Sequence, residues 1–297
     1  MRELPTPTFD VSNLVKSPLT SLFAPRATLP LVPAGLPVQP VGESKRSTDV
    51  APTELTVRWA RHLDDVRAAQ ALRYQVFAQE MGARLSTPVP LHDIDLFDDY
   101  CEHLLVVDSA SNTVVGTYRV LTPTQARRVG SFYSDTEFDL TRLRSLRERM
   151  VELGRSCVHP DHRSGAVIMA LWGALADFMV RNQLDTMIGC ASIPMQYQGP
   201  NGWVEGGQAA AAIWQRLRQT HLASVEFHVR PRLPLPVDDV GMDPAIEPPA
   251  LIKGYLRLGA KVLGAPAWDP DFNTADLPLM MRMADMSPRY RKHFLKC

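Results

Sequence analysis

The chain has 297 residues, of which 45% are hydrophobic and 22% charged, and its 32 basic residues balance 32 acidic ones. This composition predicts a globular protein of one large or two small domains, and the zero net charge disfavours nucleic acid as a partner. The first residues lack the apolar core of a signal peptide, and no window holds the ~18 apolar residues that cross a bilayer. The four scattered cysteines lack C-x-x-C spacing, so we expect reduced thiols, no metal site and a cytoplasmic protein.

Residues 1–52 contain nine of the 25 prolines. Because proline fixes φ and cannot donate a ladder hydrogen bond, this stretch predicts a flexible extension in front of a domain at residues 53–297. Its apolar side chains also allow a second interpretation, a short amphipathic segment that packs on the domain or touches a membrane surface peripherally. These side chains are Leu14, Leu19, Leu22 and Phe23.

The first half of the domain predicts a strand, a helix and a hairpin. Residues 55–59 alternate as in a strand, and residues 64–81 carry apolar side chains at helical spacing up to Gly82, a residue typical of the position after a helix. Residues 103–107 and 114–121 are apolar or β-branched and flank a polar turn, which indicates a β-hairpin.

Strands and helices alternate in the second half. Hydrophobic periodicity predicts strands at 150–158, 185–191, 224–229, 255–263 and 277–283, and helices at 166–180, 208–218 and 287–295. This order, with hairpins before it, predicts an α/β fold in which a mixed central sheet carries helices on both faces.

An acidic segment at residues 92–99 holds four aspartates with Ile94, Leu96 and Phe97 between them. One interpretation is a hydrophilic loop that faces water. The other is a pocket for a cationic substrate, which the apolar residues favour because a loop anchored by them holds its carboxylates in fixed positions. Arginines within apolar elements need partners, and the candidates are Arg73, Arg119 and Arg155.

Glu152 and Arg155 lie on one predicted strand and are three residues apart. In an unbroken strand they face opposite sides of the sheet, whereas Gly154 between them permits a bulge that changes this. Internal ion pairs and a catalytic role both remain open for these two residues.

The turn at 159–165 precedes an apolar helix, so its free backbone amides could bind a phosphate. It lacks the glycines of a nucleotide-binding loop, and the alternative is a simple capped loop. Cys157 and Cys190 lie in apolar strands, where inert buried thiols are more common than nucleophiles.

Seven separated blocks of the sequence resemble the ornithine-lipid N-acyltransferases, from about Arg58 to Leu263. A skeleton of arginine, spaced acids and E-x-x-R is also similar to the acyl-homoserine-lactone synthases. The blocks are 72–77 with 80–83, 95–106, 115–119, 132–134, 137–139, 152–158 and 188–192.

The resemblance implies a GNAT-type α/β fold and an amide-forming acyltransferase. Such an enzyme moves a (3-hydroxy)acyl chain to the α-amino group of ornithine, the first step of ornithine lipid synthesis. It implies Glu152 as the base with Arg155 as a second catalytic residue. It also implies an amino-acid site made of Arg73, Asp95, Asp98, Arg119 and Phe132.

The donor implied by the resemblance is an acyl thioester on the phosphopantetheine of acyl carrier protein, with no bound cofactor. We expect its arm at Val158, Arg163, Ser164 and Gly165, where the glycines that cradle coenzyme A in GNAT acetyltransferases are reduced. A carrier-protein arm has one phosphate and needs fewer free amides. Two basic clusters could steer the acidic carrier, although a solvated surface is the alternative; they are Arg142, Arg144, Arg147 and Arg149, and Arg289, Arg291, Lys292 and Lys296.

Other functions stay open at this point. They are an acyl-homoserine-lactone-type signal synthase, an N-acyltransferase for another amino acid such as glycine, and a non-catalytic module that binds acyl carrier protein or lipid. The expected location is the cytoplasm, with contact at the inner face of the membrane as an alternative.

Overall fold

The computed structural model describes residues 54–204, 207–237 and 245–295, all of which belong to one compact unit at residues 50–297. The predicted proline-rich extension at 1–52 lies outside the described residues. Within the described ranges, no helix combines the length and the apolarity that a membrane crossing requires.

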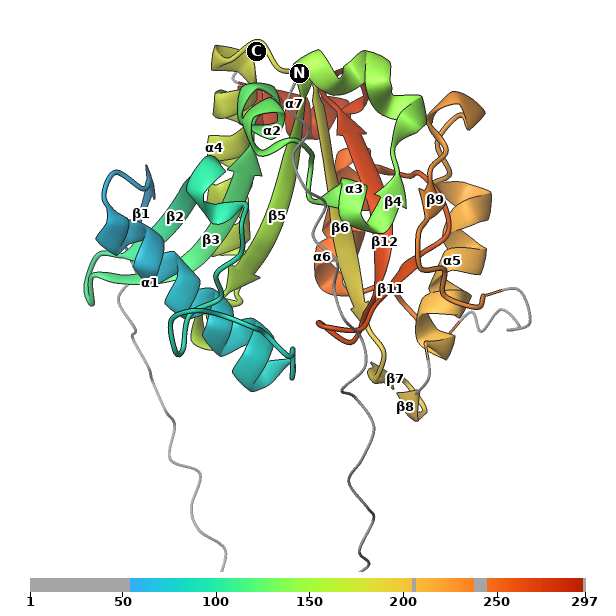
Figure 1. The fold of residues 1–297 in the computed structure, drawn as a ribbon, viewed down its shortest axis with the longest axis horizontal. Helices are drawn as coiled ribbons and strands as arrows, with labels where there is room; N and C mark the ends of the chain where they lie inside the picture. Colours follow the sequence, from blue (N-terminus) through green and yellow to red (C-terminus); the bar gives the residue numbers. More distant parts are fainter. Residues whose placement is uncertain (1–53, 205–206, 238–244, 296–297) are drawn as a thin grey trace, which may run out of the picture. The chain divides into compact units, whose positions relative to one another are not determined.

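An eight-stranded mixed sheet forms the centre of this unit (Figure 1). Its strand order is β1-β2-β3-β5-β6-β12-β10, and β11 also pairs with β12. Strands β5 and β6 run parallel, while the other neighbours in this sheet are antiparallel. The strands are β1 (Leu55–Trp59), β2 (Glu102–Asp108), β3 (Thr113–Leu121), β5 (Met150–Val158), β6 (Thr186–Pro194), β10 (Lys261–Val262), β11 (Ala267–Asp269) and β12 (Thr274–Arg282).

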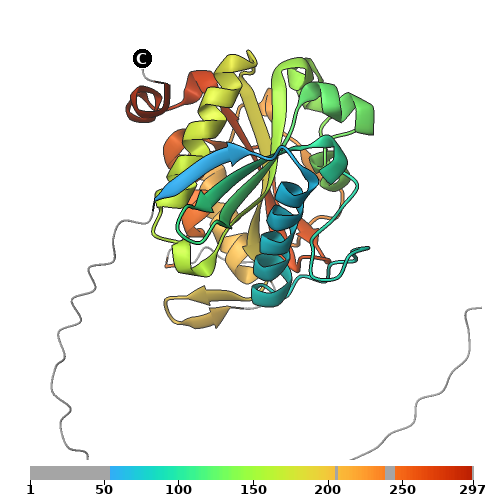
Figure 2. The same cartoon turned by 90° about the vertical axis from the view of Figure 1, so that its left-hand side faces the viewer.

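Helices cover both faces of the sheet, as the sequence predicts. Alternate residues of β2 point to opposite faces: Leu104 packs in the cluster of helix α4 (Ala166–Arg181), and Leu105 packs with Ala69 of helix α1 (Leu63–Tyr74). Figure 2 shows α1 and α4 on either side of the strands.

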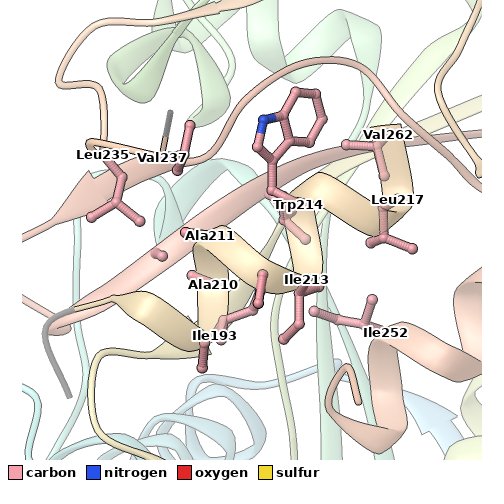
Figure 3. Packing of buried hydrophobic residues seen from close by; sticks show 14 of the residues in the cluster. Ile193, Ala210, Ala211, Ile213, Trp214, Leu217, Leu235, Val237, Ile252 and Val262 are labelled. Carbon is pink, nitrogen blue, oxygen red and sulfur yellow. The ribbon is translucent and has the colours of Figure 1, made fainter. Parts of the chain in front are cut away.

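The remaining segments divide between these two faces. The helices are α2 (Pro123–Val129), α3 (Ser134–Glu137), α5 (Gln208–Thr220), α6 (Ala250–Leu258) and α7 (Pro288–Leu295), with a 3₁₀ segment at Thr141–Arg149. On the α4 face, helix α5 packs its apolar side against β6, β12 and α6, and Figure 3 shows Ile213 pointing toward Ile252. Two small ladders pair β4 (Phe138–Asp139) with β9 (Arg230–Pro231), and β7 (Tyr197–Gly199) with β8 (Gly202–Val204).

The predicted helix at 64–81 and its stop at Gly82 are close to the structure. Helix α1 passes into a π-helical stretch at Gln75–Glu80, and Gly82 follows with φ of +79°, a conformation that glycine adopts without strain.

Two predicted strands are wrong. Residues 224–229 contain a 3₁₀ turn at Val225–Phe227, in which the Phe227 amide donates to the Ser224 carbonyl and Val225 stays exposed. Residues 255–263 are divided between α6 and the short β10, because helical spacing runs from Ile252 to Leu258 and Gly259 then ends the helix at φ +115°.

Strands β5 and β6 separate after a short parallel ladder. Three pairs join them, and the last is Glu152 with Ile188. Gly189 then lies so close to β5 that a Cβ atom there would meet the Leu153 carbonyl oxygen at 2.4 Å. Beyond this contact the two strands diverge (Figure 1), so backbone groups of β5 next to the gap lack a β6 partner in the ladder. This divergence positions the candidate site.

Candidate active site

A β-bulge shapes strand β5 where it leaves β6. In the ladder with β3, Arg119 pairs with Gly154 and Thr117 pairs with Cys157. The step from one pair to the next is therefore two residues long on β3 and three on β5, so β5 carries one extra residue. Arg155 takes this position with φ of +49°, an uncommon backbone conformation for a residue other than glycine. The extra residue brings Arg155 to the α1 face, which Glu152 also occupies, as the sequence allowed.

Arg73 of α1 is fully buried and binds the acidic segment. Its Nε atom donates to Asp93 Oδ2 at 2.9 Å, and Nη2 donates to Asp98 Oδ2 at 2.8 Å and also to the Asp93 carbonyl. One planar guanidinium therefore fixes both ends of the loop.

Arg119 and Arg155 bind the same loop from strands β3 and β5. Arg119 Nη1 donates to Asp95 Oδ1 at 2.5 Å. Arg155 donates to Asp93 Oδ2 at 3.1 Å and to Asp95 Oδ2 at 3.0 Å. We call these three arginines with Asp93, Asp95 and Asp98 the arginine–aspartate network.

This network is balanced in charge, since three buried guanidinium groups face three carboxylates. Burial alone would raise the pKa of Asp98, but Arg73 outweighs it and holds the pKa well below its usual range. Arg119 and Arg155 likewise lower the pKa of Asp95 against the effect of burial. The geometry therefore favours arginine binding by Asp95 and Asp98 over the water-facing loop and the cationic-substrate pocket that the sequence suggests.

Aromatic rings enclose the guanidinium of Arg155. The Tyr133 ring centre lies 5.0 Å from its central carbon, and that of Phe272 lies 4.6 Å away. Cation–π contacts of this kind add to the ion pairs that fix the side chain. Tyr133 is therefore placed between the network and the gap beside β5.

Glu152 anchors the start of helix α3. Its carboxylate accepts hydrogen bonds from the backbone amides of Tyr133 and Ser134, at 2.5 and 2.7 Å, and from the Ser134 hydroxyl. Burial raises its pKa, and these hydrogen bonds oppose that rise. Both oxygens therefore accept hydrogen bonds, and the Ser134 hydroxyl is the side-chain donor among these three.

A second acidic cluster lies next to Ser134, and we call Glu137, Cys190, Asp269 and Asp276 the inner acidic cluster. One ligand atom each from Glu137, Cys190 and Asp276 lie within 4.8 Å of one another, a spacing that could hold a cation. Burial and then the charge of Asp276 raise the pKa of Glu137 to about 9. Burial also raises the pKa of Asp276 to about 6.

The predicted donor turn lies at the start of α4. Gly165 precedes the helix with φ of +94°, and no side chain caps the first amides. Arg163 binds Glu80 through two hydrogen bonds of 2.6 and 2.7 Å, and its Nε donates to the Val158 carbonyl. Ser164 lies in the turn between them. The four residues predicted to bind the donor arm, Val158, Arg163, Ser164 and Gly165, thus lie close together, and Arg163 is paired with Glu80.

Phe132 lies apart from the arginine–aspartate network. It is buried in the same apolar cluster as Leu143 and Met150. The guanidinium of Arg147 lies 5.2 Å from its ring centre. Phe132 also lines a groove of about 540 Å³, together with Arg127 and Arg144 among others.

Comparison with known proteins shows the family of this chain. The chain is 36% identical over 264 residues to the L-ornithine N(alpha)-acyltransferase of Rhodobacter capsulatus. The aligned region covers 83% of this chain and 96% of that relative. The chain belongs to the L-ornithine N(alpha)-acyltransferase family. The family member from Brucella abortus is 36% identical to this chain over 258 residues, and the aligned region covers 81% of this chain and 88% of that protein.

An acetyltransferase (GNAT) domain model matches residues 72–173 of this family member, from Arg73's helix to the middle of α4. The crystal structure of the AHL synthase LasI aligns with a TM-score of 0.48 at 12% identity, over 82% of this chain and 96% of that one. The L-ornithine N(alpha)-acyltransferase family and the GNAT domain make the chain an acyltransferase with an α/β fold.

Sequence reasoning assigned no role to four residues of the candidate site, namely Tyr133, Ser134, Glu137 and Asp276, although the first three lie in the family-like blocks 132–134 and 137–139. A signal for Asp276 was present, because it is an acid within the apolar strand β12, as unusual as the arginines in β3 and β5. Ser134 and Glu137 lie on a four-residue helix whose role depends on Glu152, and no local pattern reveals that contact.

Replacement of Arg73 by lysine tests the arginine–aspartate network. Lysine keeps the charge, but it lacks the planar fork that reaches Asp93 and Asp98 together. We expect Arg73→Lys to lower the free energy of unfolding by about 2 kcal/mol or more. The exposed Arg127, paired with Glu148, gives the matched control: Arg127→Lys should change stability by less than about 0.5 kcal/mol. Urea unfolding followed by circular dichroism measures both, and equal values for the two variants contradict the network's role.

Proposed function

We propose that this protein transfers an acyl chain from a thioester to the α-amino group of ornithine, as the names of its relatives indicate for those proteins. The observation that carries the proposal is the family membership over most of the chain. The geometry supports it, because polar groups gather where β5 and β6 separate. The product on this account is an acyl-ornithine, the precursor of ornithine lipid.

The chemistry requires an uncharged amine beside a thioester carbonyl. The amine nitrogen attacks the carbonyl carbon, the carbonyl oxygen becomes negative, and the carbon–sulfur bond then breaks to release a thiol. Backbone amides of β5 beyond Glu152, which lack a ladder partner on β6, are suited to stabilise the oxygen. The amine proton needs an acceptor, because most α-amino groups carry a proton at neutral pH.

Glu152 is the proposed proton acceptor, acting through the Ser134 hydroxyl. That hydroxyl donates to Glu152 and lies 3.4 Å from Cys190 Sγ, on the side of the inner acidic cluster. Burial raises the pKa of Glu152, which brings a carboxylate closer to the basicity that a general base needs. Arg155 acts by holding Tyr133 and the acidic loop in place.

The donor arm is proposed to bind between the gap and helix α4. The uncapped amides at the start of α4 suit the single phosphate of a phosphopantetheine arm. Arg163 closes one side of this turn through its pair with Glu80. On the α4 face, a small apolar pocket of about 50 Å³ adjoins Leu153 and is lined by Met187, Met281 and Met286 among others. Flexible methionines can widen such a pocket for an acyl chain.

Acyl carrier protein is the proposed carrier of the thioester. The groove between α2 and the 3₁₀ segment presents Arg127, Arg144 and Arg147. Four arginines here are partly engaged. Arg127 pairs with Glu148 and Arg147 with Asp135, while Arg142 donates to the Val225 carbonyl and Arg149 pairs with Asp185. A basic surface of this kind attracts an acidic partner and speeds its association.

The first test is an assay with purified protein. With acyl carrier protein charged with a 3-hydroxyacyl chain and with ornithine, we expect an acyl-ornithine amide, identified by mass spectrometry. Replacing the carrier by acyl coenzyme A should lower kcat/KM by about tenfold or more, because the carrier's surface contacts are lost. Absence of any acyl amino acid with a full set of amino acids contradicts the proposed function. Equal rates with the two donors contradict the choice of carrier alone.

The second test concerns Glu152. A base whose pKa is raised leaves the enzyme inactive at low pH and active above that pKa. We expect Glu152→Gln to lower kcat by about 100-fold and to remove the acidic limb of the kcat/KM profile, with a smaller change in KM. Ser134→Ala should lower kcat in the same direction. The exposed Glu148 provides the control, Glu148→Gln, which should keep the parent profile. Turnover that is unchanged across pH in Glu152→Gln removes this residue from the mechanism.

A further inference from the structure

The inner acidic cluster differs from the arginine–aspartate network in its charge. Its carboxylates come from three elements: Glu137 ends α3, Asp269 ends β11 and Asp276 lies in β12. Among the described residues, no arginine or lysine makes an ion pair with any of the three. The charge of Arg155 acts on Asp276, but Asp93 and Asp95 already bind this guanidinium.

Glu137 is the incomplete member of the cluster. Both of its carboxylate oxygens are buried, and neither accepts a hydrogen bond from the protein. The Cys190 thiol and the Tyr133 hydroxyl face it without reaching good hydrogen-bond geometry. A buried acceptor without a partner is unfavourable, so a donor from outside the chain would satisfy Glu137.

The other two carboxylates are held in position. Asp276 is 4% exposed, and its Oδ1 accepts from the Thr274 hydroxyl at 2.8 Å. Asp269 Oδ1 accepts from the amides of Asp271 and Phe272 at 2.8 and 3.0 Å. These bonds fix the direction of both groups. The carboxylates of Asp269 and Asp276 are thus preorganised to face a positive charge.

An ammonium group suits this site, because two of the carboxylates and the thiol lie close enough together to surround one small cation. An ammonium carries three N–H donors, which can reach Glu137 and Asp276 together. The reacting α-amine must be uncharged, so a paired carboxylate site is unsuited to it. The ammonium group that suits the carboxylates is therefore the side-chain amino group of the substrate.

We propose that Glu137 and Asp276 bind the side-chain ammonium of the diamino-acid substrate and so select it over neutral amino acids. This inference rests on the proposed function. The Ser134 hydroxyl lies 3.4 Å from Cys190 Sγ, which places the proton acceptor and the inner acidic cluster next to each other. One small amino acid can therefore present its α-amine to Ser134 and its side chain to Glu137.

The protonation state of Glu137 depends on the groups packed around it in the inner acidic cluster. Groups that face Glu137 are Tyr133, Cys190, Asp269 and Asp276, with Arg155 near Asp276. The folded pKa of Glu137, about 9, lies above its ordinary value of 4.5. Without a ligand, the folded protein thus holds a proton that the unfolded chain releases, and stability falls as pH rises between these two values. A bound ammonium reverses this, because it favours the ionised carboxylate.

Glu137→Gln tests the proposal with two substrates that differ in charge. Ornithine and 2-aminopentanoic acid share the same carbon chain, and the second lacks the side-chain ammonium. We expect the variant to lower kcat/KM for ornithine by about 100-fold and to leave that for 2-aminopentanoic acid within about twofold. Glu226→Gln is the matched control, because Glu226 is exposed in the 3₁₀ turn at Val225–Phe227; it should keep the parent preference.

A stability measurement separates binding from a structural role. At pH 8, Glu137→Gln should unfold at the same temperature as the parent protein or higher, since it removes an unpaired acid. A variant that keeps the ornithine preference overturns the inference while the proposed function stands. Stoichiometric metal in the parent protein that Glu137→Gln lacks also overturns it, in favour of a metal site. A parent protein that acylates no amino acid overturns both.

Discussion

The buried guanidinium of Arg73 is the interaction on which the rest of the site depends. It joins helix α1 to both ends of the acidic loop through Asp93 and Asp98. The loop then offers Asp95 to Arg119 and Arg155, which connect it to the central strands. Removing one member would leave charges buried without partners, an unfavourable state of several kcal/mol. The network therefore fixes the bulged strand beside which the acyl transfer is proposed to occur.

The two acidic groups of the site differ in whether a cation of the chain faces them. The arginine–aspartate network, which has its cations, is the structural part, and the inner acidic cluster, which lacks one among the described residues, is the proposed binding part. The aspartates of the arginine–aspartate network have lowered pKa values because arginines face them. Glu137 and Asp276 have raised pKa values because burial is not offset by a cation. The first group stabilises the fold at neutral pH, and the second destabilises it until a ligand binds. Proteins tolerate such local conflicts where function requires them.

Much of the fold could be predicted, because β1 and β5 begin and end where hydrophobic patterning places them. The errors occurred where one residue changes the local geometry, as at Gly259, which ends a helix inside an expected strand. The bulge was foreseen through Gly154, yet Arg155 adopts the left-handed conformation. Glu137 could not be assigned a role, since its neighbours come from β6, β11 and β12, and only the folded sheet brings these together.

A crystal structure of this protein with ornithine bound tests the central claim, that arginines pair with the carboxylates of the arginine–aspartate network and no cation in the described part of the chain pairs with those of the inner acidic cluster. We predict that the side-chain nitrogen of ornithine lies within hydrogen-bonding distance of Glu137 and Asp276, with the pairs of Arg73, Arg119 and Arg155 unchanged. A side-chain nitrogen bound to Asp95 or Asp98, with an arginine displaced, would contradict the account.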